Sequence, residues 1–227
     1  MLARLVSSLD LAPDVRHFEF EVEDREEFRF TPGQFVSVKE QVAGKEVTRA
    51  YSIASAPDGK RFALCLNRVD EGLVSPHLFT LTPGAHIELQ EPLGYFTLRH
   101  AEKPAVFVAT GTGIAPFRSI LLASLEKNAP ITLLFGARYA HGLLYRDELE
   151  ALAKQHAHFR FLPTITRPDE TWGGAVGRVQ RHLDEVLAQH ETPDVYICGL
   201  KEMVDDVRAL LKKKGFDRKR IIYEKYD

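Results

Sequence analysis

The hydrophobic pattern of the chain changes near residue 100, and this change constrains the fold more than any other feature. Before it, short segments of alternating hydrophobic and polar residues are separated by turns rich in proline and glycine; they are His17–Val22, Phe35–Val38, Phe62–Asn67 and His86–Gln90. Such alternation is typical of antiparallel strands, and closure into a barrel removes their exposed edges. We therefore expect an antiparallel six-stranded β-barrel over residues 1–99.

After residues 99–103, continuous hydrophobic strands alternate with amphipathic helices. The expected strands are Ala105–Ala109, Ile131–Phe135, Phe159–Leu162, Val195–Cys198 and Ile221–Tyr223, and the expected helices are Pro116–Leu125, Arg146–Gln155, Arg178–Ala188 and Glu202–Lys213. Strands that are hydrophobic throughout are typical of parallel sheets. The second expected domain, residues 104–227, is thus a Rossmann-like parallel sheet with helices on both faces.

Composition argues against several classes of partner and location. The 30 basic and 32 acidic side chains give a net charge of −2, so nothing in the total charge suggests nucleic acid or a membrane. No stretch approaches the roughly 20 apolar residues that span a bilayer. The acidic stretch Glu19–Glu27 is expected to be the solvated side of a hairpin. Two cysteines are too few for an iron-sulfur cluster, and so small a number fits a reducing cytoplasm. We therefore expect a cytoplasmic protein without a metal. The expected assembly is a monomer or weak dimer.

A glycine-rich loop follows the first expected parallel strand. Gly111, Thr112 and Gly113 come directly after the strand, and Pro116 suits the first turn of the next helix. Glycines let the backbone approach a pyrophosphate closely, and the helix N-terminus offers free N–H groups. An ordinary tight turn would contain similar glycines, but the strand-loop-helix context favours a phosphate-binding loop.

Residues that follow the other parallel strands could complete a dinucleotide site. Arg138 follows the second strand, Arg167 follows the third and Arg178 starts the next helix. Guanidinium groups beyond the carboxyl ends of parallel strands accommodate a 2′-phosphate, which favours NADPH over NADH. Cys198 and Gly199 end the fourth strand, so the thiol could pack against a nicotinamide. Solvated arginines and a buried structural cysteine are the alternatives.

Two stretches of the first domain have side chains that suit a flavin. Arg49, Tyr51 and Ser52 offer a cation for phosphate, an aromatic ring for stacking and a hydroxyl for a hydrogen bond near the reactive nitrogen. The stretch Gly72–Ser75 adds a serine cap before a proline at the first position of a short helix. The helix N-terminus could receive a pyrophosphate. An ordinary capped helix over a barrel mouth would have the same pattern.

Together, these motifs resemble those of the ferredoxin-NADP reductase family, in its plant-type and bacterial members. The matching stretches follow the family's order over nearly the whole chain and are RAYSIAS (Arg49–Ser55), GLVS (Gly72–Ser75), GTGIAPFRS (Gly111–Ser119), LLYRDEL (Leu143–Leu149), CGLKEM (Cys198–Met203) and EKY (Glu224–Tyr226). The resemblance implies FAD in the barrel, NADP(H) as co-substrate in the second domain, and ferredoxin, flavodoxin or another small redox carrier as partner.

The residue pattern and the resemblance together give a set of expected site residues. Those expected at FAD are Arg49, Ala50, Tyr51, Ser52, Asn67, Arg68, Val69, Gly72, Leu73, Val74, Ser75, Thr112 and Tyr226. Those expected at NADP(H) are Gly111, Thr112, Gly113, Pro116, Arg138, Arg167, Arg178, Cys198, Gly199 and Met203.

Four residues are expected to be catalytic: Ser52, Cys198 and Tyr226 from these sets, and Glu224. The resemblance implies that Cys198 lies beside the nicotinamide, Glu224 assists proton and electron transfer, and Tyr226 stacks on the flavin. Plant-type members end on that tyrosine, whereas this chain continues to Asp227, which could alter the stacking.

The expected activity is electron transfer between NADPH and a one-electron carrier, by hydride transfer through FAD. Two other enzymes would fit the same motifs: an NADH-dependent reductase component of an oxygenase, and a free-flavin reductase. The alternative from another class is a redox-sensing or structural subunit that binds a dinucleotide without turning it over.

Overall fold

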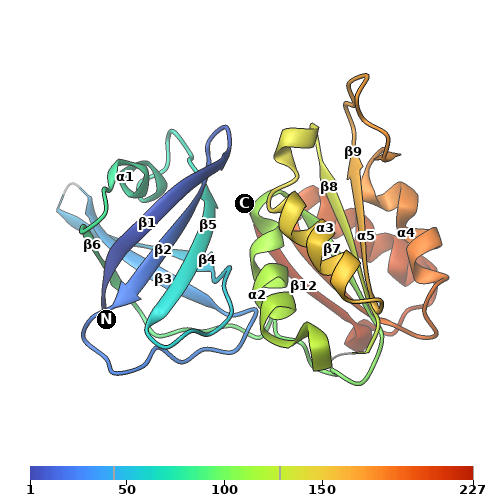
Figure 1. The fold of residues 1–227 in the computed structure, drawn as a ribbon, viewed down its shortest axis with the longest axis horizontal. Helices are drawn as coiled ribbons and strands as arrows, with labels where there is room; N and C mark the ends of the chain where they lie inside the picture. Colours follow the sequence, from blue (N-terminus) through green and yellow to red (C-terminus); the bar gives the residue numbers. More distant parts are fainter. Residues whose placement is uncertain (43, 128, 227) are drawn as a thin grey trace. The chain divides into compact units, whose positions relative to one another are not determined.

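The computed structural model describes residues 1–42, 44–127 and 129–226, and the chain divides into two compact units (Figure 1). The first comprises Met1–Leu98 with Ala115–Ala123, and the second comprises Arg99–Ile114 with Ser124–Asp227. Most of the helix Ile114–Ser124 is therefore assigned by its contacts to the first unit. The domain limits expected from the sequence place this helix in the second domain. Those limits, 1–99 and 104–227, stay a prediction.

The first unit is built on a six-stranded antiparallel sheet. In the order β4-β3-β6-β1-β2-β5 it contains β1 (Leu2–Ala12), β2 (Val15–Val22), β3 (Phe35–Val42), β4 (Lys45–Ser52), β5 (Arg61–Asn67) and β6 (His86–Leu89). Just beyond β4, Ile53 pairs with Leu64 of β5, and the Ala54 amide donates to the Ala63 carbonyl at 2.8 Å. The two edge strands thus meet, and the predicted six-stranded barrel is confirmed.

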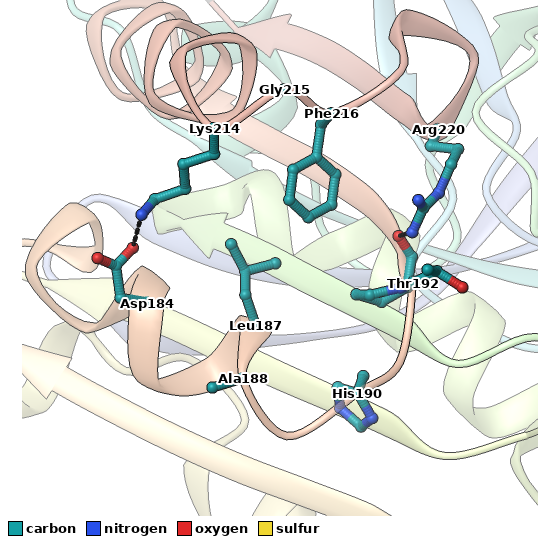
Figure 2. A pocket seen from close by; sticks show the side chains of 10 residues that line it. Asp184, Leu187, Ala188, His190, Thr192, Lys214, Gly215, Phe216 and Arg220 are labelled. Atoms are coloured by element: carbon teal, nitrogen blue, oxygen red, sulfur yellow. Dashed lines mark hydrogen bonds and ion pairs between the residues drawn. The ribbon is translucent and has the colours of Figure 1, made fainter.

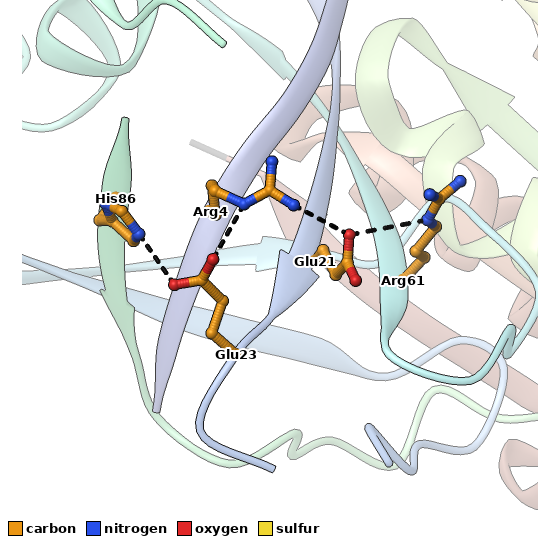
Figure 3. A network of polar contacts seen from close by, with 5 residues as sticks. All are labelled: Arg4, Glu21, Glu23, Arg61 and His86. Atoms are coloured by element: carbon orange, nitrogen blue, oxygen red, sulfur yellow. Dashed lines mark hydrogen bonds and ion pairs between the residues drawn. The ribbon is translucent and has the colours of Figure 1, made fainter. Parts of the chain in front are cut away.

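Alternation along the strands gives the barrel a hydrophobic inside and a charged outside. On β2, Phe18, Phe20 and Val22 are fully buried, while Glu19 and Glu21 between them point outward. Outside, Arg4 lies 3.1 Å from Glu21 and 2.9 Å from Glu23, and Glu23 also contacts His86 at 2.9 Å (Figure 3). This part of the acidic stretch is therefore the paired outer face of a hairpin.

The second unit contains a six-stranded parallel sheet. In the order β10-β9-β8-β7-β11-β12 its strands are β7 (Ala105–Thr110), β8 (Ile131–Ala137), β9 (Phe159–Ile165), β10 (Ala175–Val176), β11 (Asp194–Leu200) and β12 (Ile221–Tyr226). Nearly every residue of β7, β8 and β11 is buried. The continuous hydrophobic runs of the sequence therefore correspond to parallel strands, as predicted.

Helices cover both faces of the parallel sheet. Figure 1 shows α3 (Arg146–Gln155) on one face, and α4 (Val179–Leu187) and α5 (Lys201–Lys213) on the other. The buried side of α4 and α5 packs on valines and isoleucines of β7 and β11 in one core. Helix α2 (Ile114–Ser124) follows β7, and the short helix α1 (Ser75–Thr80) belongs to the first unit.

Candidate cofactor-binding sites

The carboxyl ends of β7 and β11 mark the point where the strand order of the parallel sheet reverses. From β7 the chain builds β8, β9 and β10 toward one edge, and it then returns to build β11 and β12 on the other side of β7. Open α/β sheets bind nucleotides beyond the strand ends at such a point. The predicted loop Gly111–Gly113 follows β7 here, and Cys198 and Gly199 lie near the end of β11.

Glycines allow these two strand ends to approach each other closely. A Cβ atom on Gly113 would clash with the Cys198 carbonyl, and one on Gly199 would clash with Thr110. Gly111 has a φ of +55°, and no heavy atom lies within 4 Å of the position its Cβ would take. The backbone of the loop is therefore open to a ligand at Gly111, and its surroundings fit a pyrophosphate.

Thr110 is a residue of this site that the sequence analysis does not identify. Its hydroxyl accepts a hydrogen bond from the Leu200 amide at 3.3 Å, which joins the ends of β7 and β11. A threonine at the end of a strand is common, so only the packing of the two strand ends reveals its role.

Three of the four expected catalytic residues come together on β11 and β12. Cys198 is fully buried and is paired in register with Glu224, and the Tyr226 side chain is hydrogen-bonded to the Cys198 thiol. Burial, and next the Glu224 carboxylate, raise the pKa of the thiol well above its usual value. Cys198 is therefore an un-ionised thiol at neutral pH. Asp227 lies outside the described residues.

The three expected phosphate-binding arginines lie at the carboxyl edge of β8, β9 and β10. The Arg167 amide donates to the Arg138 carbonyl at 2.8 Å, which joins the segments after β8 and β9. Arg178 lies two residues after Val176, which pairs with Ile165 at the end of β9. The two-residue strand β10 is too short to predict from sequence, and it brings Arg178 to this edge.

The guanidinium groups at this edge are available to a phosphate. All three side chains are exposed, and among the residues that the structure describes none of them pairs with a carboxylate. Arg167 donates to the Tyr139 hydroxyl at 3.0 Å, and the Tyr139 ring stacks on His141 at 5.4 Å between centroids. Tyr139 therefore orients Arg167, a contact that the sequence analysis does not predict.

In the first unit, β4 carries the residues expected to hold the flavin. Arg49 is exposed, Tyr51 is half-buried against the barrel core and Ser52 is buried. Burial raises the pKa of Tyr51 to about 12, against a smaller opposing effect of Arg49, so the phenol stays neutral. An exposed cation, a neutral aromatic ring and a hydroxyl within four residues fit the phosphate, ring and reactive edge of FAD. Ala50 lies among them on β4, exposed.

The loop between β5 and α1 folds back on itself. The Val69 amide donates to the Ser75 hydroxyl at 3.0 Å, and the Gly72 amide donates to the Val69 carbonyl at 2.7 Å. Val74 is the residue that precedes α1, and no side chain caps the helix. The prediction that Ser75 caps this helix is therefore wrong, because its hydroxyl accepts the loop amide of Val69 instead.

The remaining expected residues lie in different environments. Asn67 is exposed at the end of β5, and Arg68, Val69 and Leu73 are exposed in the loop after it, whereas Val74 is packed in the barrel core. Met203 is buried in the core beneath α5, so its side chain has a packing role in the second unit. Thr112 belongs to the glycine loop, and Pro116 is in α2.

A cavity of about 540 Å³ lies at the opposite edge of the parallel sheet, beside the starts of β11 and β12 (Figure 2). Its charged groups already have partners. Lys214 contacts Asp184 at 2.6 Å, and Arg220 donates to the Pro193 carbonyl at 2.5 Å. His190 contacts the Thr132 hydroxyl at 2.8 Å. Because the cavity is remote from the strand ends that bind nucleotides, we do not assign a cofactor to it.

Within residues 1–42, 44–127 and 129–226, no helix has the length and apolar character needed to cross a membrane. The same residues contain no group of three or more histidine, cysteine, aspartate or glutamate side chains arranged to hold a metal ion.

Known proteins match both halves of the chain. Residues 2–98 match the oxidoreductase FAD-binding domain, and residues 107–209 match the oxidoreductase NAD-binding domain. The chain is 44% identical to ferredoxin-NADP reductase B of Sorangium cellulosum over 99% of its own length and 97% of that protein. It is 32% identical to the toluate 1,2-dioxygenase electron transfer component of Pseudomonas putida over 87% of its length, but covers only 59% of that longer protein.

A solved structure has the same fold. A ferredoxin NADP⁺ reductase from Neisseria gonorrhoeae with bound FAD and NADP superposes with a TM-score of 0.86, and the match covers 99% of this chain and 98% of that one. Its sequence identity to this chain is 24%, so this likeness concerns the fold.

Proposed function

This chain belongs to the ferredoxin-NADP reductase family, and from that premise we propose that it moves electrons between NADPH and ferredoxin or flavodoxin. FAD, when bound, supplies the chemistry that links a two-electron hydride donor to a one-electron carrier. The protein's part is to bind, orient and electrostatically adjust the two cofactors. The observation that carries the proposal is the carboxyl edge of the parallel sheet. An open glycine loop follows β7 there, a neutral thiol lies near the end of β11, and an exposed arginine follows each of β8, β9 and β10.

Coenzyme selection is assigned to the arginine edge. Arg138, Arg167 and Arg178 would hold the 2′-phosphate of NADPH through charge-assisted hydrogen bonds, while Gly111 and Gly113 let the loop backbone approach the pyrophosphate. The fixed orientation of Arg167 against Tyr139 supports this assignment, because a pre-oriented fork loses less conformational freedom when it binds phosphate.

The nicotinamide is assigned to the end of β11. A buried, un-ionised Cys198 presents a compact and polarizable surface without a negative charge, and Tyr226 holds it by a hydrogen bond. Glu224, beside Cys198 in the neighbouring strand, is the group proposed to assist proton and electron transfer there. Whether Tyr226 stacks on the flavin stays a prediction.

The flavin is assigned to the first unit. Arg49 would hold phosphate, the neutral ring of Tyr51 would stack on the flavin, and the Ser52 hydroxyl would hydrogen-bond its reactive edge. The proposed location is the cytoplasm, since both cysteines are free thiols. A monomer or weak dimer remains the predicted assembly.

One alternative has a specific observation behind it. The similarity to the toluate dioxygenase electron transfer component supports a reductase that serves an oxygenase. NADH is the coenzyme that the sequence-based alternative predicts for it. Steady-state assays with NADPH and NADH, each combined with ferredoxin, flavodoxin and free flavin, distinguish the proposed enzyme from an oxygenase reductase and from a free-flavin reductase. The proposal requires higher kcat/KM with NADPH and reduction of a protein carrier; a preference for NADH supports the oxygenase reductase, and reduction of free flavin alone supports a flavin reductase.

A further inference from the structure

Two neighbouring side chains of α2 hold the backbone that follows β4. The Arg118 guanidinium donates to the Ala54 carbonyl at 2.6 Å, and the Ser119 hydroxyl donates to the Ser55 carbonyl at 2.7 Å. All four residues belong to the first unit, and Ser119 is fully buried. Adjacent residues of one helix therefore bind adjacent carbonyls of one extended segment.

The barrel binds three other polar groups of this segment. The Ile53 amide donates to the Gln34 carbonyl at 2.9 Å, and the Ala54 amide donates to the Ala63 carbonyl at 2.8 Å. The Ser55 hydroxyl accepts from the Ala63 amide at 3.0 Å. The amide groups thus fix the segment to the barrel, whereas the carbonyls of Ala54 and Ser55 are fixed by α2.

This segment begins directly after the residues assigned to the flavin. Tyr51 and Ser52 lie only two to four residues before the two anchored carbonyls, and the backbone between them has little freedom to adjust independently. Helix α2 itself begins at Ile114, immediately after the Gly111–Gly113 loop. One helix therefore starts at the proposed phosphate loop and carries the anchor of the proposed flavin segment in its second turn.

We propose that Arg118 and Ser119 are positioning residues that hold the flavin-binding segment in its binding geometry, an inference that rests on the proposed function. Neither needs to contact FAD. Removing either donor leaves the carbonyl of buried Ala54 or of half-buried Ser55 without that partner, and the segment moves to find another one. The consequence falls on the side chains of Tyr51 and Ser52.

The test compares Arg118→Met, Arg118→Lys and Ser119→Ala with the native chain. Arg118→Met keeps the unbranched stem and removes the donor, whereas Arg118→Lys keeps one cationic donor and serves as the conservative rescue. The matched control is Ile87→Val, which loosens the buried barrel core without touching these carbonyls. All variants are compared at temperatures set equally far below their own Tm.

Two measurements are made on the full chain. Hydrogen exchange of the Ile53 and Ala54 amides, with and without FAD, measures the anchoring directly. The dissociation constant of FAD and the visible circular dichroism of the bound flavin measure its consequence. In Arg118→Met and Ser119→Ala we expect exchange to accelerate and FAD to bind about tenfold more weakly, the equivalent of about 1.4 kcal/mol. Arg118→Lys should recover part of both losses. Ile87→Val should have native exchange and native FAD affinity.

The inference is overturned if Arg118→Met and Ser119→Ala both have native hydrogen exchange and native FAD affinity. It is also overturned if Ile87→Val changes exchange and FAD affinity as much as those two variants do. If the native chain binds no FAD, the proposed function fails, and the exchange measurement still decides whether α2 anchors this segment. Acceleration without any change in flavin affinity or spectrum would mean that the contacts are only structural, which also overturns the positioning role.

Discussion

Replacing Arg167 with alanine tests the coenzyme assignment where the structure is most specific. Arg167 is exposed, is not paired with a carboxylate among the described residues, and is oriented by the Tyr139 hydroxyl at 3.0 Å. The substitution removes one guanidinium from the arginine edge and leaves the nearby glycine loop unchanged. NADPH and NADH differ only in the 2′-phosphate, so a phosphate ligand must affect them unequally.

The size of the effect follows from the exposure of the site. A hydrogen bond to a charged group contributes about 1.5–3 kcal/mol, and solvent screening at an exposed position favours the lower part of that range. A loss of about 1.5–2 kcal/mol corresponds to roughly a 10- to 30-fold decrease in kcat/KM for NADPH. We expect less than about a twofold change for NADH, which lacks the phosphate.

The assay is stopped-flow reduction of the bound flavin by each coenzyme over a range of salt concentrations. Salt should reduce the advantage of NADPH in the native enzyme more than in Arg167→Ala, because the lost interaction is ionic. The matched control is Arg160→Ala, which changes an arginine within β9, the strand that Arg167 follows; Arg160 pairs with Glu185 at 2.9 Å. Equal losses with NADPH and NADH, or an equal effect of Arg160→Ala, would refute the 2′-phosphate assignment.

Three further predictions follow from other parts of the sites. Gly113→Ala should weaken NADP⁺ binding and lower the free energy of unfolding by about 1–3 kcal/mol, because the added Cβ clashes with Cys198. Titration with NADP⁺ and denaturant unfolding measure the two effects. The control Gly173→Ala, with open space around its Cβ, should have native binding, and native behaviour of Gly113→Ala would contradict the packing. The pKa of Cys198 is raised in the folded protein, so above a pH of about 8.5, the ordinary pKa of a thiol, the folded chain keeps a proton that the unfolded chain loses. In that pH range the free energy of unfolding should fall by up to about 1.4 kcal/mol per pH unit. Urea titrations between about pH 8 and 9.5 should find a shallower decline in Cys198→Ala, and identical slopes would exclude a buried neutral thiol. Tyr51→Phe should retain flavin, since the phenol is neutral throughout this range, whereas Tyr51→Ala should lose it; flavin absorbance of the purified variants decides.

The elements with a strong local pattern are the ones that the sequence predicts well. Continuous burial makes β7, β8 and β11 recognisable, and the glycine loop is recognisable because it follows such a strand. Strand β1 is harder to predict, because irregularities in its pairing with β2, between Leu5 and Ser7 and between Asp10 and Ala12, interrupt the alternation.

Contacts between distant segments account for what the sequence could not predict. The bond from Tyr226 to Cys198 depends on the register of β12 against β11, and the role of Thr110 depends on how closely β7 and β11 pack. Ser75 matches a helix cap in its local sequence, yet its hydroxyl binds an amide six residues earlier. Local sequence therefore predicts which residues gather at each site better than it predicts the bonds between them.

Anaerobic titration of the purified chain with NADPH tests the central claim most directly. The account predicts that the chain retains FAD in an amount equal to the protein, that NADPH bleaches its visible absorbance faster than NADH does, and that added ferredoxin or flavodoxin restores the absorbance. A chain that retains no FAD, or whose bound FAD neither coenzyme bleaches, would contradict it.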